Sequence, residues 1–176
     1  MIGDFLNLAR LEDGKVELHK EVFDLQPLIE EVVYDAYFIT SVHTIRQSDL
    51  HVNVYADRDK IGQVLNNLLT NAIKYSTSGS TILIGCEEAD GKVKISITDE
   101  GIGISLENQQ KLFDRFYRVK SEHISTISGF GVGLYLASEI LKFHESEIFV
   151  ESKLGVGSTF YFSLPVQIGQ TLLDQI

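Results

Sequence analysis

Near residue 80 the spacing of the hydrophobic residues changes from a helical period to a strand period. Before this point, apolar residues recur about every three or four positions, which predicts amphipathic helices at 25–36 and 57–75. After it, two apolar runs predict strands at 81–87 and 92–98, and Asp90-Gly91 between them predicts a hairpin turn. Helices with one apolar stripe need a sheet to cover, so the chain is expected to fold as an α+β domain.

Further elements are expected on both sides of this hairpin. They are a helix at 1–13 that stops at Gly14, a loose strand at 15–23, a strand at 50–55, a helix at 132–143, and strands at 147–152 and 158–164. Asp24 and Asp57 are the expected N-caps of the two long helices. The polar connection at 105–128 is long for a compact domain, and such connections are usually functional, so a mobile lid is expected there.

Length and composition indicate one soluble globular domain with short appendages. The 176 residues are 44% hydrophobic and 23% charged, and we expect an appendage at 1–14, a domain at 15–166 and a tail at 167–176. The formal net charge of −10 argues against binding to nucleic acid or to an anionic membrane, which require a basic surface. No apolar run approaches the roughly 18 residues of a membrane span, so we expect a cytoplasmic domain.

A polar stripe runs along the second long helix beside its apolar one. Asn67, Asn71 and Lys74 follow one another at helical spacing, and Tyr75 lies four residues after Asn71. A solvated helix face would explain them, but asparagine is a poor helix former, which favours a function. Amide oxygens suit Mg²⁺ that already binds phosphate, the lysine suits a phosphate oxygen, and the tyrosine ring can stack on a base.

Of two glycine-rich segments, the first follows a predicted strand and the second leads into a predicted helix. Asp99 ends a strand in the sequence DEGIG, which by itself is compatible with a simple turn. The second segment, GFGVGL at 129–134, lacks both the spacing of a dinucleotide fingerprint and the lysine of a P-loop. Its glycines can let backbone amides approach an anion at the start of the next helix.

Two further segments complete the set of candidate functional sequences. FDRFYR at 113–118 can form a hydrophobic plug through its phenylalanines, while Arg115, Arg118 and Lys120 supply positive charge next to the expected lid. GVGSTF at 155–160 predicts a tight turn and places two hydroxyls, Ser158 and Thr159, after it.

In this order and spacing, NNLLTNAIKYS, DEGIG, FDRFYR, GFGVGL and GVGSTF resemble the ATP-binding catalytic domain of sensor histidine kinases. The resemblance implies the GHKL or Bergerat fold shared with gyrase and MutL, a two-layer sandwich in which three helices cover one face of a mixed sheet, with a mobile ATP lid. It implies ATP and Mg²⁺ as cofactors. It also implies an ATP site formed by Asn67, Asn71, Lys74, Tyr75, Asp99, Gly101, Gly103, Arg115, Arg118, Gly129, Gly131, Gly133, Leu134, Ser158 and Thr159.

Within that set the resemblance implies individual roles. Asn67 and Asn71 would contact Mg²⁺, and these asparagines with Lys74 and Arg118 would act at the reacting phosphates. Asp99 would accept a hydrogen bond from the adenine amino group, as a carboxylate can. Ser158 or Thr159 would contact adenine directly or through water.

The resemblance also implies partners that lie outside the chain. The γ-phosphoryl group would pass to a histidine on a dimerisation hairpin of a homodimeric parent kinase, and then to the receiver domain of a response regulator. None of the five histidines here has the acceptor context, and residues 1–14 resemble the end of the second hairpin helix running into its linker. His144 is followed by Glu145-Ser146 where the family usually has two glycines. A serine kinase of the anti-sigma type and a degenerate nucleotide-sensing module remain alternatives.

Overall fold

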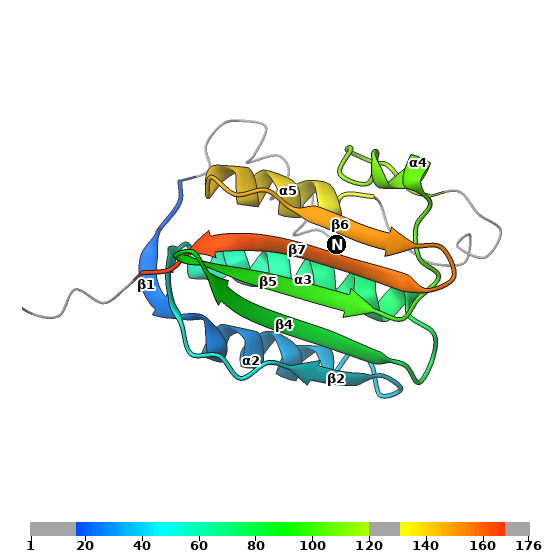
Figure 1. The fold of residues 1–176 in the computed structure, drawn as a ribbon, viewed down its shortest axis with the longest axis horizontal. Helices are drawn as coiled ribbons and strands as arrows, with labels where there is room; N and C mark the ends of the chain where they lie inside the picture. Colours follow the sequence, from blue (N-terminus) through cyan, green and yellow to red (C-terminus); the bar gives the residue numbers. More distant parts are fainter. Residues whose placement is uncertain (1–16, 120–130, 168–176) are drawn as a thin grey trace, which may run out of the picture.

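The computed structural model describes residues 17–119 and 131–167, which form two layers (Figure 1). Three helices, α2, α3 and α5, lie on one face of a sheet. The elements are β1 (Glu21–Asp24), α2 (Leu25–Ala36), β2 (Thr44–Gln47), β3 (Asn53–Ala56), α3 (Arg58–Tyr75), β4 (Thr81–Ala89), β5 (Lys92–Asp99), α4 (Leu106–Gln109), α5 (Gly133–Phe143), β6 (Phe149–Lys153) and β7 (Gly157–Pro165).

The main sheet has the order β2-β4-β5-β7-β6. β2 pairs with β4 in parallel and the other neighbours are antiparallel, so the sheet is mixed. β1 and β3 form a separate antiparallel pair. The predicted α+β class, with helices over one face of a mixed sheet, is confirmed. In the described part of the chain no helix is long and apolar enough to cross a membrane.

Local sequence signals placed most of these elements correctly. Asp24 and Asp57 cap their helices as predicted, with side-chain oxygens that accept from the backbone N–H groups of Gln26 and Lys60 at 3.1 and 3.0 Å. The Asp90-Gly91 turn also forms, and both of its residues have positive φ, as a type I′ hairpin turn requires.

Some predicted elements differ from the structure. The strand expected at 15–23 lies at Glu21–Asp24, while β2 and α4 had not been predicted. Both missed elements are four residues long, too short for a hydrophobic period to be detected. The helix expected at 1–13, the tail at 167–176 except its first residue, and the last part of the expected lid, 120–128, lie outside the described residues.

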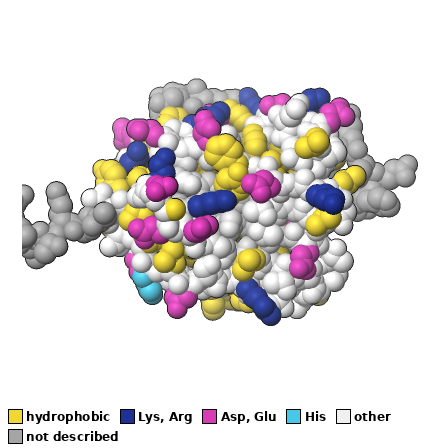
Figure 2. Space-filling model, in the orientation of Figure 1, with side chains coloured by type: hydrophobic (Ala, Val, Ile, Leu, Met, Phe, Trp, Pro, Cys, Tyr) yellow, Lys and Arg dark blue, Asp and Glu magenta, His cyan; other side chains and the backbone are white. Residues whose placement is uncertain are grey.

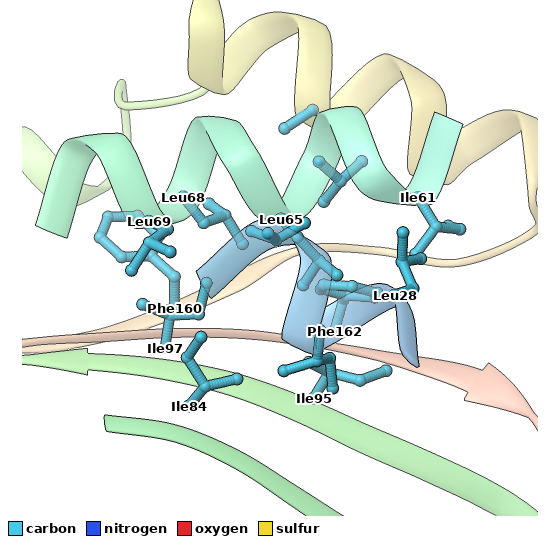
Figure 3. Close-up of a cluster of buried hydrophobic side chains, with 14 of the residues drawn as sticks. Leu28, Ile61, Leu65, Leu68, Leu69, Ile84, Ile95, Ile97, Phe160 and Phe162 are labelled. Atoms are coloured by element: carbon cyan, nitrogen blue, oxygen red, sulfur yellow. The ribbon is translucent and has the colours of Figure 1, made fainter. Parts of the chain in front are cut away.

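The core lies between α3 and the sheet (Figure 3). Leu65, Leu68 and Leu69 project from α3 toward the inward side chains of β4, β5 and β7, which include Ile84, Ile95, Ile97, Phe160 and Phe162. Burial of each such side chain contributes about 1.5 to 3 kcal/mol. The packing therefore fixes α3, which carries the polar stripe, against the strands that carry Asp99 and Ser158.

The other face of the sheet is open to solvent. Figure 2 shows charged side chains of both signs mixed with hydrophobic ones on this face. Tyr161 stacks on Phe149 with ring centroids 5.4 Å apart, and the Nζ of Lys94 lies 4.1 Å from the tyrosine ring centroid. Antiparallel sheets commonly leave one face solvated in this way, while the other face packs on the core.

The departure at Glu145-Ser146 leaves the helix-ending turn intact. Glu145 adopts φ +56°, and its N–H and that of Ser146 donate to the carbonyls of Lys142 and Leu141 at 3.0 and 2.9 Å. This is the Schellman pattern, in which glycine usually occupies the left-handed position. The left-handed conformation costs glutamate about 1 to 2 kcal/mol. The Ser146 hydroxyl also donates to the carbonyl of Ser163 at 2.7 Å, which ties the turn to β7.

His144 joins the end of α5 to the beginning of α3. Its side chain is buried, its Nε2 accepts from the backbone N–H of Asp57 at 3.0 Å, and its Nδ1 lies 2.8 Å from the carbonyl of Ile140. Since a carbonyl only accepts, Nδ1 carries the hydrogen and the ring is neutral. Burial lowers the pKa of His144 below its ordinary 6.5, and nearby Lys20 acts in the same direction. The hydrogen bond to the carbonyl of Ile140 and, to a smaller extent, Asp57 oppose this shift without reversing it.

We expect stability to decline as the pH falls below about 6.5, because the unfolded chain then binds a proton that the folded His144 excludes. This contribution is fully present above pH 6.5 and is lost on acidification. Urea unfolding at pH 7.5 and 5.5 measures it, with His144→Gln as the variant that cannot titrate. An equal loss of stability in parent and variant would contradict the assignment.

Candidate functional site

The polar stripe of α3 ends beside the loop that follows β5. The backbone N–H of Ile102 donates to the carbonyl of Tyr75 at 3.3 Å, and that of Thr77 donates to Glu100 at 3.3 Å. Ser76 and Gly101 also form an antiparallel bridge. A Cβ on Gly101 would overlap the carbonyl oxygen of Tyr75, so this close approach requires glycine. The fold thus brings the predicted helix and strand-end residues together.

Asp99 is a buried carboxylate at this junction. Its residue is only 6% exposed, and its Oδ1 accepts from the N–H of Gly101 at 2.9 Å. Burial raises the pKa of Asp99, while the backbone N–H groups of Gly101 and Ser158 act in the opposite direction. Burying a carboxylate is costly for the folded chain, because the charged form loses its hydration. Such groups are therefore candidates for a functional site.

The second glycine segment, GFGVGL, approaches α3 at Asn67. A Cβ built on Gly133 would lie 3.4 Å from the Oδ1 of Asn67, so the first residue of α5 passes the side chain of the polar stripe. Val132 supplies no side-chain cap there. Gly131 has φ +70° and its carbonyl accepts from the N–H of Phe116 at 3.0 Å. Leu134 packs against the core, whereas Gly129 lies outside the described residues.

The FDRFYR segment lies against Gly131. Phe113 packs on the core as a plug, whereas Phe116 is 52% exposed, with the Arg115 guanidinium carbon 4.6 Å from its ring centroid. Arg118 is exposed, and Lys120 lies outside the described residues. The Tyr117 hydroxyl donates to the Oδ1 of Asn108 at 2.7 Å, which ties this segment to α4. The backbone between the two arginines therefore lies next to Gly131, two residues before α5 begins.

The two hydroxyls after the last turn lie on opposite faces of the sheet. Ser158 pairs with Asp99 across β5 and β7, so the two side chains share the inward face. Thr159 pairs with Thr98, and their hydroxyl oxygens lie 3.0 Å apart on the outward face. The structure therefore brings Ser158, and not the side chain of Thr159, to the buried carboxylate.

One residue of this region had no signal in the sequence. Ser152 lies on β6, and its hydroxyl contacts the N–H of Ile104, the carbonyl of Gly157 and the hydroxyl of Ser158. Serine on a short strand is unremarkable, and only the strand register brings it here. In the described ranges no group of three or more His, Cys, Asp or Glu residues could hold a metal ion.

Comparison with known proteins gives a consistent result. A sequence profile of the family described as "Histidine kinase-, DNA gyrase B-, and HSP90-like ATPase" matches residues 56–168. Among curated proteins, the chain is 33% identical over 173 residues to the sensor histidine kinase WalK of Bacillus subtilis, which covers 94% of this chain and 28% of WalK. It is 36% identical over 176 residues to the adaptive-response sensory kinase SasA of Thermosynechococcus vestitus, covering 94% and 44%. The chain thus spans less than half the length of these relatives.

Solved structures agree in fold. The catalytic domain of histidine kinase ThkA matches with a TM-score of 0.69 and 29% identity, over 85% of this chain and 96% of that one. Full-length ShkA, solved in complex with AMPPNP, matches with a TM-score of 0.80 and 25% identity, over 97% of this chain and 36% of that one.

Proposed function

The chain belongs to the family of histidine kinase-, DNA gyrase B- and HSP90-like ATPases, and on that premise we propose that it is the ATP-binding catalytic domain of a sensor histidine kinase. Its reaction is transfer of the ATP γ-phosphoryl group to a histidine on a dimerisation hairpin of a longer, homodimeric parent. A receiver domain of a response regulator then accepts the phosphoryl group. We assign residues 15–166 to the catalytic domain, 1–14 to the end of the parent's dimerisation hairpin and its linker, and 167–176 to a C-terminal tail. ATP as the substrate favours a cytoplasmic location.

The buried Asp99 beside the α3 stripe is the observation that supports this function best. An ionised carboxylate only accepts hydrogen bonds, so Asp99 favours a base that carries an exocyclic amino group. Of the two common purines, adenine has such a group and has no carbonyl that would face the carboxylate. Tyr75 stands at the adjoining end of α3 and supplies a ring for stacking. Ser158 shares the inward face with Asp99 and is the second acceptor that we propose for the base.

The phosphates would lie toward the beginning of α5. The N-terminus of this 11-residue helix carries no side-chain cap, and its backbone N–H groups favour an anion. Lys74 from α3, with Arg115 and Arg118 from the FDRFYR segment, adds positive charge to a chain whose net charge is −10. In phosphoryl transfer, positioning and charge neutralisation of this kind supply most of the catalysis.

Mg²⁺ fits the donor set beside these groups. The Oδ1 of Asn67 faces the backbone at Gly133, and Asn71 lies one helical turn further along α3. Amide oxygens are suitable for a hard cation that shares its remaining coordination with phosphates and water. When bound, the ion neutralises phosphate charge, and Asn67 and Asn71 would hold it.

Asn71→Ala is expected to remove most of the gain in ATP affinity that Mg²⁺ provides, because it deletes one of two proposed amide ligands. Titration calorimetry with ATP, with and without Mg²⁺, measures this gain. Asn66→Ala is the matched control, since Asn66 is an exposed asparagine on the same helix outside the stripe. If both variants keep the full gain, Asn71 is only a residue of the helix face.

Phosphoryl transfer is tested with radiolabelled ATP. The chain alone should bind ATP and acquire little label, because none of its histidines has the acceptor context, and it should label the parent's helical hairpin when this is added in trans. Transfer should be slow without covalent linkage, which lowers the effective concentration. Acid-labile label on the hairpin supports the proposal. Acid-stable label would indicate a serine kinase, and absence of ATP binding would indicate a degenerate module.

A further inference from the structure

Three polar side chains form a row across the sheet at the base of the site. Asp99 on β5 pairs with Ser158 on β7, and Ser158 pairs with Ser152 on β6. Cross-strand partners lie on the same face, so all three point inward, next to the buried pair of Ile97 and Phe160. Ser158 thus lies between Asp99 and Ser152, and Ser152 is one strand further from the carboxylate.

The hydroxyl of Ser152 makes three hydrogen bonds. It accepts from the N–H of Ile104 at 2.8 Å, lies 2.9 Å from the carbonyl oxygen of Gly157, and lies 2.9 Å from the hydroxyl of Ser158. The contacts join the loop after Asp99, the turn before β7 and the row of serines. The carbonyl of Ser152 also accepts from the Nε2 of Gln109 at 3.0 Å, which attaches α4.

The donors in this network can be assigned because each hydroxyl has one hydrogen. A carbonyl oxygen can only accept, so Ser152 must donate its hydrogen to Gly157. The bond between the serines can then form only if Ser158 donates to Ser152. Ser158 has no hydrogen left for another partner, and its oxygen presents only lone pairs to a group that docks beside Asp99.

We propose that Ser152 is a positioning residue for nucleotide selection: it holds Ser158 as a hydrogen-bond acceptor, so that Asp99 and Ser158 together favour a base with an amino group. This proposal rests on the proposed ATP-binding function and extends it to a residue that does not touch the base. A base with a carbonyl at the same position would face two acceptors and no donor. Sites whose polar groups are left unpaired by an analogue reject that analogue strongly.

The inference is tested by comparing ATP with inosine triphosphate, in which a carbonyl replaces the adenine amino group. In Ser152→Ala the Ser158 hydroxyl is free to turn its hydrogen toward that carbonyl, so the ratio of ATP affinity to inosine triphosphate affinity should fall about three- to tenfold. Ser152→Thr keeps the hydroxyl and should keep the ratio of the parent. Ser146→Ala is the matched control, because that serine also donates to a strand carbonyl, at 2.7 Å, outside the row.

A double-mutant cycle shows whether Ser152 acts through Ser158. In a Ser158→Ala background, Ser152→Ala should leave the affinity ratio unchanged, although both affinities can fall together as the loop at Ile104 loosens. The single variant Ser158→Ala should lower the ratio by itself, because it removes the acceptor that Ser152 is proposed to hold. An unchanged ratio in this variant would therefore overturn the inference even if Ser152→Ala fails to fold.

Two results would overturn the inference. One is an unchanged ratio in Ser152→Ala or Ser158→Ala with ATP still bound by the parent, which leaves the proposed function intact. The other is failure of the parent chain to bind ATP, which removes the proposed function as well. Calorimetric titration of the full chain with each nucleotide distinguishes these results.

Discussion

Asp99→Asn is expected to weaken ATP binding roughly ten- to a hundredfold while the fold is retained. A hydrogen bond to a charged group contributes about 1.5 to 3 kcal/mol, and asparagine offers a donor where the carboxylate only accepts. The variant should melt at the parent's temperature or above it. Because burial raises the pKa of Asp99, its ionised form destabilises the empty protein at neutral pH, and asparagine carries no charge. Calorimetric titration and thermal melting measure the two effects.

Asp57→Asn is the matched control for this experiment. Asp57 is also buried, but it caps the opposite end of α3, about 27 Å away for an 18-residue helix. Asparagine is as good an N-cap as aspartate, but it cannot accept the second hydrogen bond of Asp57, from the N–H of His19 at 2.9 Å. Stability should therefore fall somewhat, whereas ATP affinity should change little. If Asp99→Asn binds ATP as tightly as this control does, the carboxylate does not recognise the base.

Gly103→Ala is expected to destabilise the fold by about 2 to 5 kcal/mol and to abolish tight ATP binding. Gly103 has φ +66°, which costs other residues about 1 to 2 kcal/mol, and overpacking adds about 1 to 3 kcal/mol. The added Cβ would overlap the carbonyl of Lys153 and lie close to the Cα of Leu154, and these are backbone atoms, which cannot move aside as a flexible side chain could. The loop between Asp99 and Ile104 would then separate from the turn before β7.

Gly155→Ala separates the two causes of this effect. Gly155 has φ +76°, but a Cβ there would meet nothing within 4 Å. The free energy of unfolding of this variant should fall only by the cost of the left-handed conformation, about 1 to 2 kcal/mol, and the variant should bind ATP like the parent. Urea unfolding and ATP titration of both variants measure the difference. Equal losses in the two would show that the contact of Gly103 with β6 does not matter.

The sequence alone predicted most of the secondary structure, two helix caps and the family of this protein. The change of hydrophobic period gave the two long helices and the hairpin, because side-chain periodicity reports which face of an element is buried. The capping contacts of Asp24 and Asp57 and the turn at Asp90-Gly91 involve backbone within four residues, so these features could be predicted without tertiary information. Glycines and polar residues in a fixed order were also sufficient to indicate the family.

Tertiary structure alone decided which of these residues meet. In the sequence, Ser158 and Thr159 are adjacent hydroxyl residues and nothing distinguishes their roles. Because side chains alternate along β7, Ser158 lies beside Asp99 and Thr159 lies beside Thr98 on the opposite face. Ser152 joins the site only through the register of β6, which long-range packing sets. The turn at Glu145 survives without glycine because α5 and β7 hold it, a compensation that local propensity does not contain.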